Sequence, residues 1–264
     1  ANVVEGLLEL GHEVYGDTPG CSTSPLEEIE YDLLIEFSNR SVNSSLTKYL
    51  SATQNLSPIY INGEDFLDDH AYNREWDCFR DPKNYKLYFR REMRPFYKKM
   101  ANEYPLPFGV YPKYLEHYNP NKNGDFIFPS NGEYPNRREI MRYILENNLP
   151  VKLGRIGEFR HSITDHGTDD YFKYLNDASV IVSACGWGQD TARYWEGLAT
   201  GACVISEKVD LVIPNPLTHM ENIIYFEHPF ELIEIFSDIK EGKIDIETIG
   251  RKGREYVLNN HMVK

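Results

Sequence analysis

Residues 179–206 read SVIVSACGWGQDTARYWEGLATGACVIS and decide the fold class, because two apolar strands here enclose one helix. The runs 179–184 and 202–206 are almost continuously apolar, which is typical of strands buried on both faces of a parallel sheet. Between them the spacing of apolar residues predicts a helix over 190–200. Gly201 follows it, and glycine is a favoured helix terminator. The stretch therefore predicts a βαβ unit.

The same alternation extends over the whole second half of the chain. A capping box formed by Asn136 and Glu139 is expected to open one of the helices. Outside the first unit, the pattern predicts strands at 126–128 and 222–226 and helices at about 137–147, 170–176, 230–239 and 246–260. Such spacing favours a parallel sheet, which binds ligands at the carboxyl ends of its strands.

The first third of the chain is less regular but shows the same alternation. A helix over 3–10 is followed by strands at 31–37 and 57–61, whereas 62–100 reads as polar, aromatic and irregular. Four prolines between residues 104 and 123 block helix and central strand alike, which predicts a domain junction. The chain opens at Ala1 directly on the helix, so we expect a first strand to be missing from the natural N-terminus. We therefore expect an α/β protein of two halves.

Composition narrows the function classes. The formal net charge is −13, from 28 basic and 41 acidic residues, so nucleic acid is an unlikely partner. The four cysteines are widely spaced without a C-x-x-C, so neither a zinc site nor a disulfide framework is expected. No apolar run approaches the ~20 residues of a membrane span, and no signal peptide is visible. We expect a cytoplasmic protein without a metal.

The loop after the first strand of the βαβ unit is a candidate phosphate site. Gly186 and Gly188 flank Trp187 and let the backbone approach a ligand closely, and a helix N-terminus offers free N–H groups to an anion. Gln189, Asp190 and Thr191 complete the loop, with Asp190 expected as the N-cap of the helix. Glycines also serve ordinary βα turns, so the loop fits either interpretation.

The helix that follows carries two charged residues on one flank. At about 100° per residue, Glu196 lies at the edge of the apolar arc and Arg193 about 60° further round. They fit a surface ion pair of a few tenths of a kcal/mol. They equally fit a site in which Glu196 accepts hydrogen bonds from a ribose and Arg193 holds a phosphate or orients Glu196.

Three further features are candidates for the same chemistry. Arg137 and Arg138 begin a helix where the macrodipole disfavours cations, so either a bound anion or solvent screening must offset their charge. His12 follows the first helix and could reach a cleft, or it is an ordinary polar turn residue. Asp65 is one of several carboxylates that could act as the general base on an acceptor hydroxyl.

The segment RYWEGLATGACVIS, residues 193–206, resembles the signature of group 1 glycosyltransferases, particularly the spore-maturation-protein-like branch. Asp125–Phe128, Arg137–Glu139 and His261 extend the similarity over about 124–261. The resemblance implies the GT-B architecture, two Rossmann-like domains with parallel sheets facing a central cleft. It implies an N-terminal acceptor domain over 1–118 and a C-terminal domain over 119–264 that binds the nucleotide sugar.

The resemblance also implies roles for individual residues. Glu196 matches the ribose-binding glutamate, and 186–191 match the turn that faces the diphosphate. Such enzymes usually need no metal or cofactor beyond the nucleotide sugar, since helix N-termini and basic side chains offset the charge of the leaving diphosphate. Many relatives carry an acidic residue eight positions before the ribose glutamate, but this chain has Gly188 there.

Three functions remain open from the sequence. The first is a glycosyltransferase, hexosyl or related, that moves a sugar from a nucleoside diphosphate to an acceptor hydroxyl. The second is a non-catalytic nucleotide- or glycan-binding protein that keeps the fold, which Gly188 favours. The third is a Rossmann-type oxidoreductase or methyltransferase, against which no G-x-G-x-x-G follows an early strand. The sugar, the base, the acceptor and the oligomeric state are not specified by the sequence.

Overall fold

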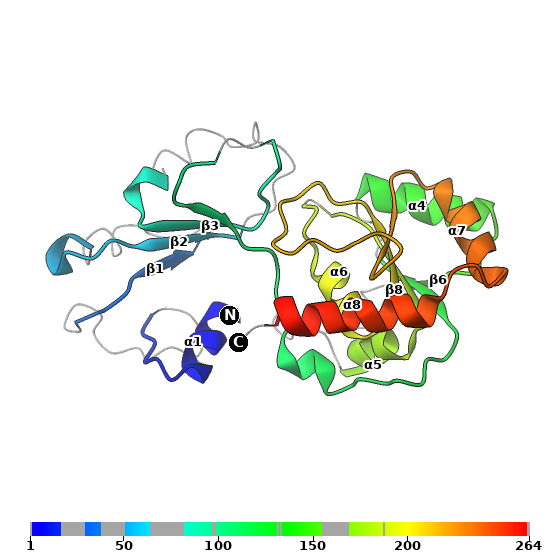
Figure 1. The fold of residues 1–264 in the computed structure, drawn as a ribbon, viewed down its shortest axis with the longest axis horizontal. Helices are drawn as coiled ribbons and strands as arrows, with labels where there is room; N and C mark the ends of the chain where they lie inside the picture. The colour runs from blue at the N-terminus through cyan, green and yellow to red at the C-terminus, as the bar shows by residue number, and fades with distance from the viewer. Residues whose placement is uncertain are drawn as a thin grey trace. The chain divides into compact units, whose positions relative to one another are not determined.

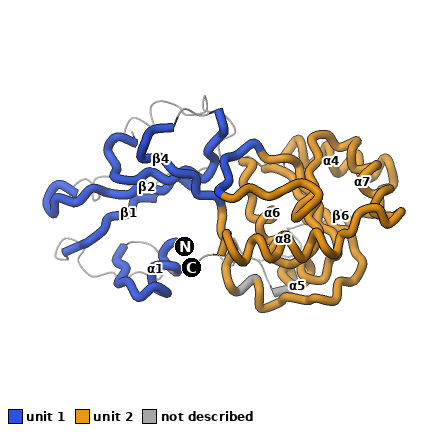
Figure 2. The backbone as a smooth tube through the Cα atoms, in the orientation of Figure 1, with its two compact units in different colours: residues 1–107, 210–214, 263–264 blue, residues 108–209, 215–262 orange. Residues whose placement is uncertain are grey.

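The chain folds into two compact units, each with its own parallel sheet (Figure 2). Unit 1 comprises residues 1–107, 210–214 and 263–264, and unit 2 comprises 108–209 and 215–262. This computed structural model describes residues 2–16, 30–37, 51–63, 82–96, 99–130, 132, 134–154, 169–186 and 188–262. The predicted α/β class with parallel sheets is confirmed. The first segment of unit 1 ends at Pro107, and Val110 pairs with Met262 within unit 2. Functional domains over 1–118 and 119–264 stay a prediction.

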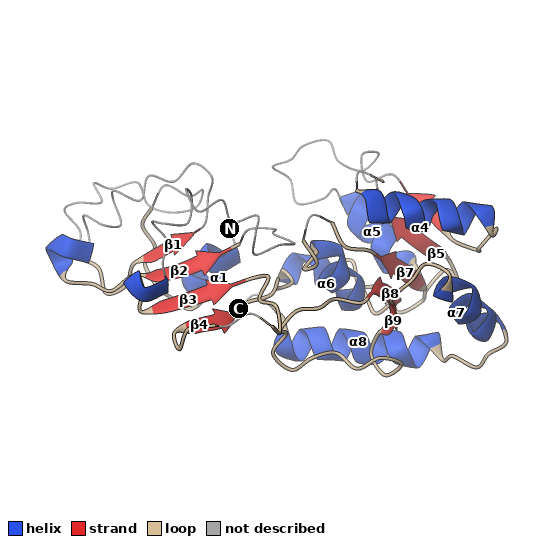
Figure 3. Cartoon of the chain, turned by 90° about the horizontal axis from the view of Figure 1, so that it is seen from above, coloured by secondary structure: helices blue, strands red, loops and turns tan. Residues whose placement is uncertain are grey.

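Unit 2 is built on five parallel strands. They are β5 (Phe126–Pro129), β6 (Lys152–Gly154), β7 (Val180–Ser183), β8 (Cys203–Glu207) and β9 (Ile224–Phe226). Their order is β6-β5-β7-β8-β9, and Figure 3 shows β5, β7, β8 and β9 side by side in this sequence. The direction of winding therefore reverses between β5 and β7. In open parallel sheets, ligands bind beyond the carboxyl ends of the strands at such a reversal.

Helices cover both faces of this sheet. They are α4 (Pro135–Glu146), α5 (Asp169–Asp177), α6 (Ala192–Ala199), α7 (Glu231–Lys240) and α8 (Ile246–Asn260). Each face of the sheet has its own apolar core, and alternate residues of β7 belong to different cores. Val180 and Val182 pack with apolar residues of α4 and α7, whereas Ile181 packs with those of α5. All four residues of β7 are buried, as its apolar run predicts.

Two predicted helix starts are wrong. Helix α4 begins at Pro135 with Tyr134 as its N-cap, and proline is pre-organised for the first helical position, so Asn136 lies inside the first turn and forms no capping box. Helix α6 begins at Ala192 with Thr191 as its N-cap. Asp190 does not cap it, because its carboxylate accepts hydrogen bonds from Trp195 and from the backbone of Phe108.

Helix α8 lies against α6 and β8, and glycines permit the close approach (Figure 1). A Cβ at Gly250 would overlap the carbonyl oxygen of Gly201 and lie 2.9 Å from the carbonyl carbon of Ala202. At Gly253 it would lie 2.7 Å from the carbonyl oxygen of Asn222. These neighbours are backbone atoms, which cannot rotate away, so the two glycines are required by packing.

Two cations occupy the other end of this sheet, where helices α5 and α6 end. Lys122 Nζ donates to the carbonyl oxygens of Asn176 (2.6 Å) and Thr200 (2.7 Å). Arg254 donates to the carbonyl of Ala199, and its guanidinium lies 3.7 Å from the ring centroid of Tyr118. Burial and the nearby Arg254 lower the pKa of Lys122 to about 8. Both cations complement the negative ends of helix dipoles.

The described residues of unit 1 include four parallel strands in sequential order. They are β1 (Ile35–Phe37), β2 (Ile59–Asn62), β3 (Leu87–Arg90) and β4 (Glu103–Pro105), with α1 (Asn2–Glu9) preceding them and a 3₁₀ turn at Pro82–Asn84. Its core is aromatic, since the Tyr60 ring lies 5.0 Å from that of Tyr85 and 4.8 Å from that of Tyr88. The sequence does not predict β3 or β4, because neither is a long or alternating apolar run.

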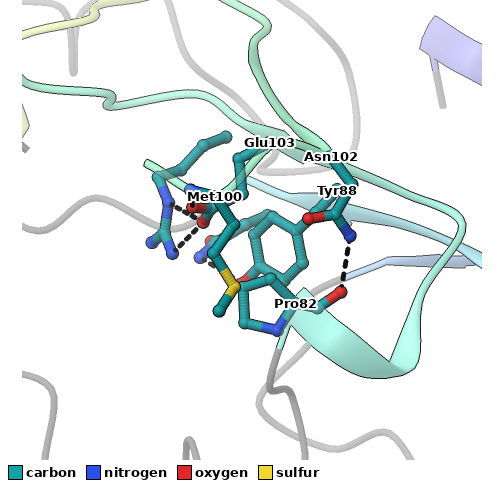
Figure 4. Close-up of polar contacts among 7 residues, drawn as sticks. Pro82, Tyr88, Met100, Asn102 and Glu103 are labelled. Carbon is teal, nitrogen blue, oxygen red and sulfur yellow. Dashed lines mark hydrogen bonds and ion pairs between the residues drawn. The ribbon is translucent and has the colours of Figure 1, made fainter. Parts of the chain in front are cut away.

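A buried ion pair joins β3 to the start of β4. Arg90 Nη2 lies 2.9 Å from Glu103 Oε1, and Glu103 is fully buried. Glu103 also accepts from the backbone of Met100 at 2.6 Å, and Asn102 donates to the Pro82 carbonyl at 2.7 Å (Figure 4). These bonds tie the start of β4 to β3 and to the 3₁₀ turn at Pro82–Asn84.

One segment of unit 1 comes from far along the sequence. Residues 210–214 lie between β8 and β9 in the chain but belong to unit 1. Val212 donates its N–H to the Met93 carbonyl at 2.7 Å, and Arg94 lies 3.8 Å from Asp210. The chain therefore leaves unit 2 after β8 and returns to it before β9, the edge strand of that unit's sheet.

Candidate functional site

The predicted donor-site residues gather at the carboxyl ends of β5, β7 and β8. The loop between β7 and α6 follows β7 directly and begins with Ala184 and Cys185. Arg193 of α6 reaches the last residue of β5, since its Nη1 donates to the Pro129 carbonyl at 2.6 Å. The site therefore borders the reversal of strand order between β5 and β7, where an open parallel sheet binds its ligands.

The backbone of Cys185 is held by side chains from two other elements. Its N–H donates to Glu207 Oε2 at 2.9 Å. Its carbonyl accepts from Arg137 Nε at 2.9 Å and from Asn136 Nδ2 at 3.1 Å. Asn136 Nδ2 also donates to Glu207 Oε2 at 2.9 Å. The first turn of α4 and the end of β8 thus fix the start of the loop, and we call Asn136 and Glu207 the loop clamp.

Arg137 supports the same loop from a buried position. Its side chain is only 4% exposed, its Nη2 donates to the Ala184 carbonyl at 3.4 Å, and its guanidinium lies 4.7 Å from the ring centroid of Tyr134. A Cβ on Gly186 would lie 3.0 Å from Arg137 Nη2, so a larger residue there would require the guanidinium to shift slightly. The hydrogen bonds from Arg137 to the carbonyl oxygens of Ala184 and Cys185 explain why a cation is tolerated in the first turn of α4. Contact between Arg137 and a ligand stays a prediction.

Arg138 has different surroundings from Arg137. Its side chain is exposed, and Nη1 donates to the Gly132 carbonyl at 3.2 Å. The adjacent arginines of α4 are therefore separated, with one buried beneath the loop between β7 and α6 and the other next to the segment after β5. A phosphate contact for Arg138 stays a prediction as well.

Arg193 and Glu196 contact different elements. An arginine guanidinium carries five N–H donors, and the Pro129 carbonyl takes one from Arg193. Glu196 is partly buried, and its Oε2 accepts from the Tyr171 hydroxyl of α5 at 3.1 Å. A carboxylate is a hydrogen-bond acceptor, which is what recognition of a ribose diol requires.

The other predicted loop residues are placed by the turn itself. Gly186 N donates to the Gly188 carbonyl at 2.8 Å, which closes a tight turn. Gly188 and Asp190 are buried, whereas Gln189 and Thr191 are partly exposed. Trp187 and Asp65 lie outside the described residues. His12 is exposed after α1 in unit 1, and its N–H donates to the Leu7 carbonyl at 3.0 Å.

Asp190 links helix α6 to the backbone of Phe108. Its carboxylate accepts from Trp195 Nε1 at 2.5 Å and from Phe108 N at 2.8 Å. The Trp195 ring stacks on His261 with 4.0 Å between centroids, and His261 Nε2 lies 3.0 Å from the Tyr256 hydroxyl. Burial lowers the pKa of His261 to about 4. The histidine is therefore neutral at neutral pH and supports the α6 helix.

This pKa predicts a pH-dependent contribution to stability. In the unfolded chain a histidine titrates near 6.5, so between about pH 6.5 and 4 the unfolded state binds a proton that the folded state does not. The stability contributed by His261 is therefore present above pH 6.5 and falls as the pH is lowered to 4. We expect His261→Phe, which keeps an aromatic ring against Trp195, to flatten this part of the profile measured by urea unfolding.

The matched control for this prediction is His228→Phe. His228 is an exposed histidine that stacks on Phe230, so the same substitution removes a histidine without burial. Its pH profile should follow the wild type. An unchanged slope between pH 6.5 and 4 in His261→Phe would contradict the assignment.

Sequence reasoning missed three residues that shape the site. Glu207, Asn136 and Tyr171 hold the loop or the Glu196 carboxylate through bonds between residues 22 to 71 positions apart. For Glu207 a signal existed, because it directly follows the predicted strand 202–206 and so lies at the ligand-binding edge. Asn136 was predicted to cap a helix instead, and no feature of the sequence indicated a role for Tyr171.

The described residues bear on two features, a membrane-spanning helix and a metal site. Among these residues no helix is both long enough and apolar enough to cross a bilayer. In the same part of the chain, no three His, Cys, Asp or Glu side chains are grouped to hold a metal ion. Cys185 and Cys203 are free and buried, and burial raises the pKa of Cys203 to about 12.

Comparisons with known proteins bear on the family and the fold. Residues 152–264 match the family described as "Glycosyl transferase-like". HepE of Anabaena, solved in complex with UDP, is similar in structure, with 11% identity, a TM-score of 0.54 and coverage of 87% of this chain and 75% of that one. A glycosyltransferase from Rickettsia africae has 12% identity, a TM-score of 0.52 and coverage of 87% and 73%.

A third structure, TarM, has 10% identity and a TM-score of 0.58, and the similarity covers 83% of this chain and 50% of that one. At such identities the likeness establishes the fold, which is GT-B. The family match supports the resemblance to group 1 glycosyltransferases for the second half of the chain. A comparison with curated protein sequences found no significant match.

Proposed function

We propose that the protein transfers a sugar, hexosyl or related, from a nucleoside diphosphate sugar to an acceptor hydroxyl. The observation that carries the proposal is the placement of Glu196, Arg193 and the β7–α6 loop beside the reversal of strand order in unit 2. Unit 2 contains most of the residues that match the glycosyl transferase-like family, and HepE with UDP shares the fold.

The roles of the residues follow from their chemistry. Glu196 would accept hydrogen bonds from the ribose hydroxyls, and Arg193 would contact the diphosphate. In the transfer, the bond from the sugar's anomeric carbon to the phosphate oxygen breaks and the acceptor oxygen bonds that carbon. The acceptor proton passes to a base, for which His12 and Asp65 are the proposed groups. Negative charge develops on the leaving diphosphate.

We propose that this charge is offset by the N-terminus of α6 and by basic side chains, without a metal or another cofactor. Arg193 and Arg138 are the partly exposed and exposed cations next to the loop. The free, buried thiols of Cys185 and Cys203 support our placement of the protein in the reducing cytoplasm. The spore-maturation-protein-like branch and a nucleotide-sugar donor remain part of this proposal.

A thermal-shift screen tests the proposal. We expect one of UDP, GDP, ADP and dTDP, or its sugar conjugate, to stabilise the protein by about 2.7 kcal/mol when present at roughly 100 times its dissociation constant. For a chain of this size that corresponds to a rise in Tm of about 5–10 °C. Absence of any shift, with calorimetry confirming no binding, would remove the proposal.

Turnover separates the enzyme from a non-catalytic binding protein. We expect slow hydrolysis or transfer to be detected with the sugar nucleotide that stabilises most, because a positioned donor reacts with water when no acceptor is present. Binding without any release of nucleoside diphosphate would favour the binding protein instead. The sequence feature that favours this alternative is Gly188, which stands where many relatives carry an acidic residue.

A further inference from the structure

We infer that the loop clamp, Asn136 and Glu207, positions the β7–α6 loop for the donor diphosphate. The inference rests on the proposed function, because it concerns the same site. It adds two positioning residues that lie outside the family-like segment 193–206 and outside the loop itself. The clamp acts on Cys185, the residue immediately before the predicted phosphate loop.

The geometry of the clamp leaves Cys185 little freedom. Glu207 Oε2 receives two N–H groups at 2.9 Å, one from the Cys185 backbone and one from the Asn136 amide. The same Asn136 amide nitrogen donates to the Cys185 carbonyl at 3.1 Å. Three hydrogen bonds therefore close a ring through Cys185, Asn136 and Glu207. Because both the N–H and the carbonyl of Cys185 take part, the direction in which the chain leaves β7 is fixed.

The charges around Cys185 have opposite signs. Arg137 donates to the Cys185 carbonyl from one side, and Glu207 accepts its N–H on the other. Hydrogen bonds to ionised groups are shorter and stronger than those between neutral groups. A carboxylate this close to a diphosphate would repel it unless its charge were engaged by donors. Two donors engage Glu207, the Asn136 amide of the clamp and the backbone N–H of Cys185.

A shift of about 1 Å in a positioning segment can lower activity by roughly a hundredfold. The turn closed by Gly186 N and the Gly188 carbonyl directly follows the clamped residue, so movement of Cys185 carries this turn with it. The clamp therefore acts on donor affinity through the loop, without touching the donor.

Calorimetric titration with UDP, GDP, ADP and dTDP, each alone, tests the inference on wild type and four variants. Glu207→Ala and Asn136→Ala should each weaken the best ligand by roughly tenfold. Together they should weaken it no more than about the larger single effect, because either change opens the same ring. Asn136→Asp should be the most damaging single change, since it opposes two carboxylates.

Exchanging the carboxylate and the amide of the pair provides a measurement that general destabilisation of the fold would not change. In Glu207→Gln with Asn136→Asp, the glutamine amide can donate to the aspartate while its oxygen still accepts the Cys185 N–H. We expect the swap to bind several-fold more tightly than Asn136→Asp alone, with titrations made well below the Tm of every variant. The control is Glu227→Gln, an exposed carboxylate just after β9 that pairs with Lys208, and it should bind as wild type does.

The outcomes distinguish the two proposals. If wild type binds none of the four nucleotides, or if Glu196→Ala binds as tightly as wild type, the proposed function fails. If wild type binds and Glu196→Ala does not, but Glu207→Ala and Asn136→Ala keep full affinity, the clamp is overturned while the function stands. Single effects that multiply in the double variant would also overturn it.

Discussion

Replacing Glu196 with alanine should weaken the binding of a nucleoside diphosphate by roughly a hundredfold while the protein stays folded. A hydrogen bond to a charged group contributes about 1.5–3 kcal/mol, and a ribose offers two hydroxyls to one carboxylate. Glu196 is partly buried, and its bond to the Tyr171 hydroxyl holds the carboxylate in place. Isothermal titration of wild type and variant measures the loss directly.

Tyr171→Phe is the matched control for this substitution. It removes the hydroxyl that donates to Glu196 but keeps the ring, which packs in the α5 core with Phe172. We expect its affinity to fall by less than about fivefold, since one neutral hydrogen bond contributes about 1 kcal/mol. Equal affinities in wild type and Glu196→Ala would mean that Glu196 is an ordinary helix side chain. Arg193→Ala should also lose affinity, because it removes the cation proposed to face the diphosphate.

Gly250→Ala should destabilise the protein by about 3 kcal/mol, although alanine is the better helix former by about 1 kcal/mol. The new Cβ would overlap the carbonyl oxygen of Gly201 and approach Ala202 and Cys203 at 2.9 Å. Helix α8 would have to move away from β8 to make room. Urea unfolding followed by circular dichroism measures the loss as a lower midpoint at an unchanged slope.

The neighbouring exposed residue provides the comparison for Gly250→Ala. Arg251→Ala places the same side chain one position further along α8 and removes only a surface ion pair with Glu255. Exposed pairs of this kind contribute about 0.3–0.5 kcal/mol, so the midpoint should hardly move. If the two variants unfold at the same urea concentration, the close contact between α8 and β8 is absent.

The sequence predicted unit 2 well because its elements carry strong local signals. The helix Ile246–Asn260 was predicted with its observed ends. In the structure Asp245 caps it by accepting from the Thr248 N–H at 3.0 Å. The buried strands β7 and β8 were within one residue or so of the predicted runs, because continuous apolar sequence suits a strand covered on both faces.

Unit 1 was predicted less well for a physical reason. Strands β3 and β4 are short, and each carries a charged residue, Arg90 or Glu103, that is buried only because the two form an ion pair. From the sequence alone each residue of such a buried pair is predicted to be exposed, because neither residue indicates its partner. The tyrosines of this core were equally ambiguous, because tyrosine suits both surfaces and interiors.

The site divides in the same way. The position of the loop and of Glu196 followed from the βαβ pattern and from the resemblance, and their roles are still predictions. The burial of Arg137 did not follow, because the carbonyls it binds lie 47 and 48 residues further along the chain. Helix dipole reasoning considered only the arginine's own helix, whereas the loop between β7 and α6 decides its environment.

The placement of residues 210–214 limits how this protein can be dissected. A fragment that ends at Pro107 would lack the partner of the Met93 carbonyl, which is Val212. A fragment that starts at Phe108 would carry those five residues between β8 and β9 without the unit to which they belong. A single cut after Pro107 therefore gives an N-terminal piece that lacks part of unit 1. The C-terminal piece contains unit 2 together with residues that belong to unit 1.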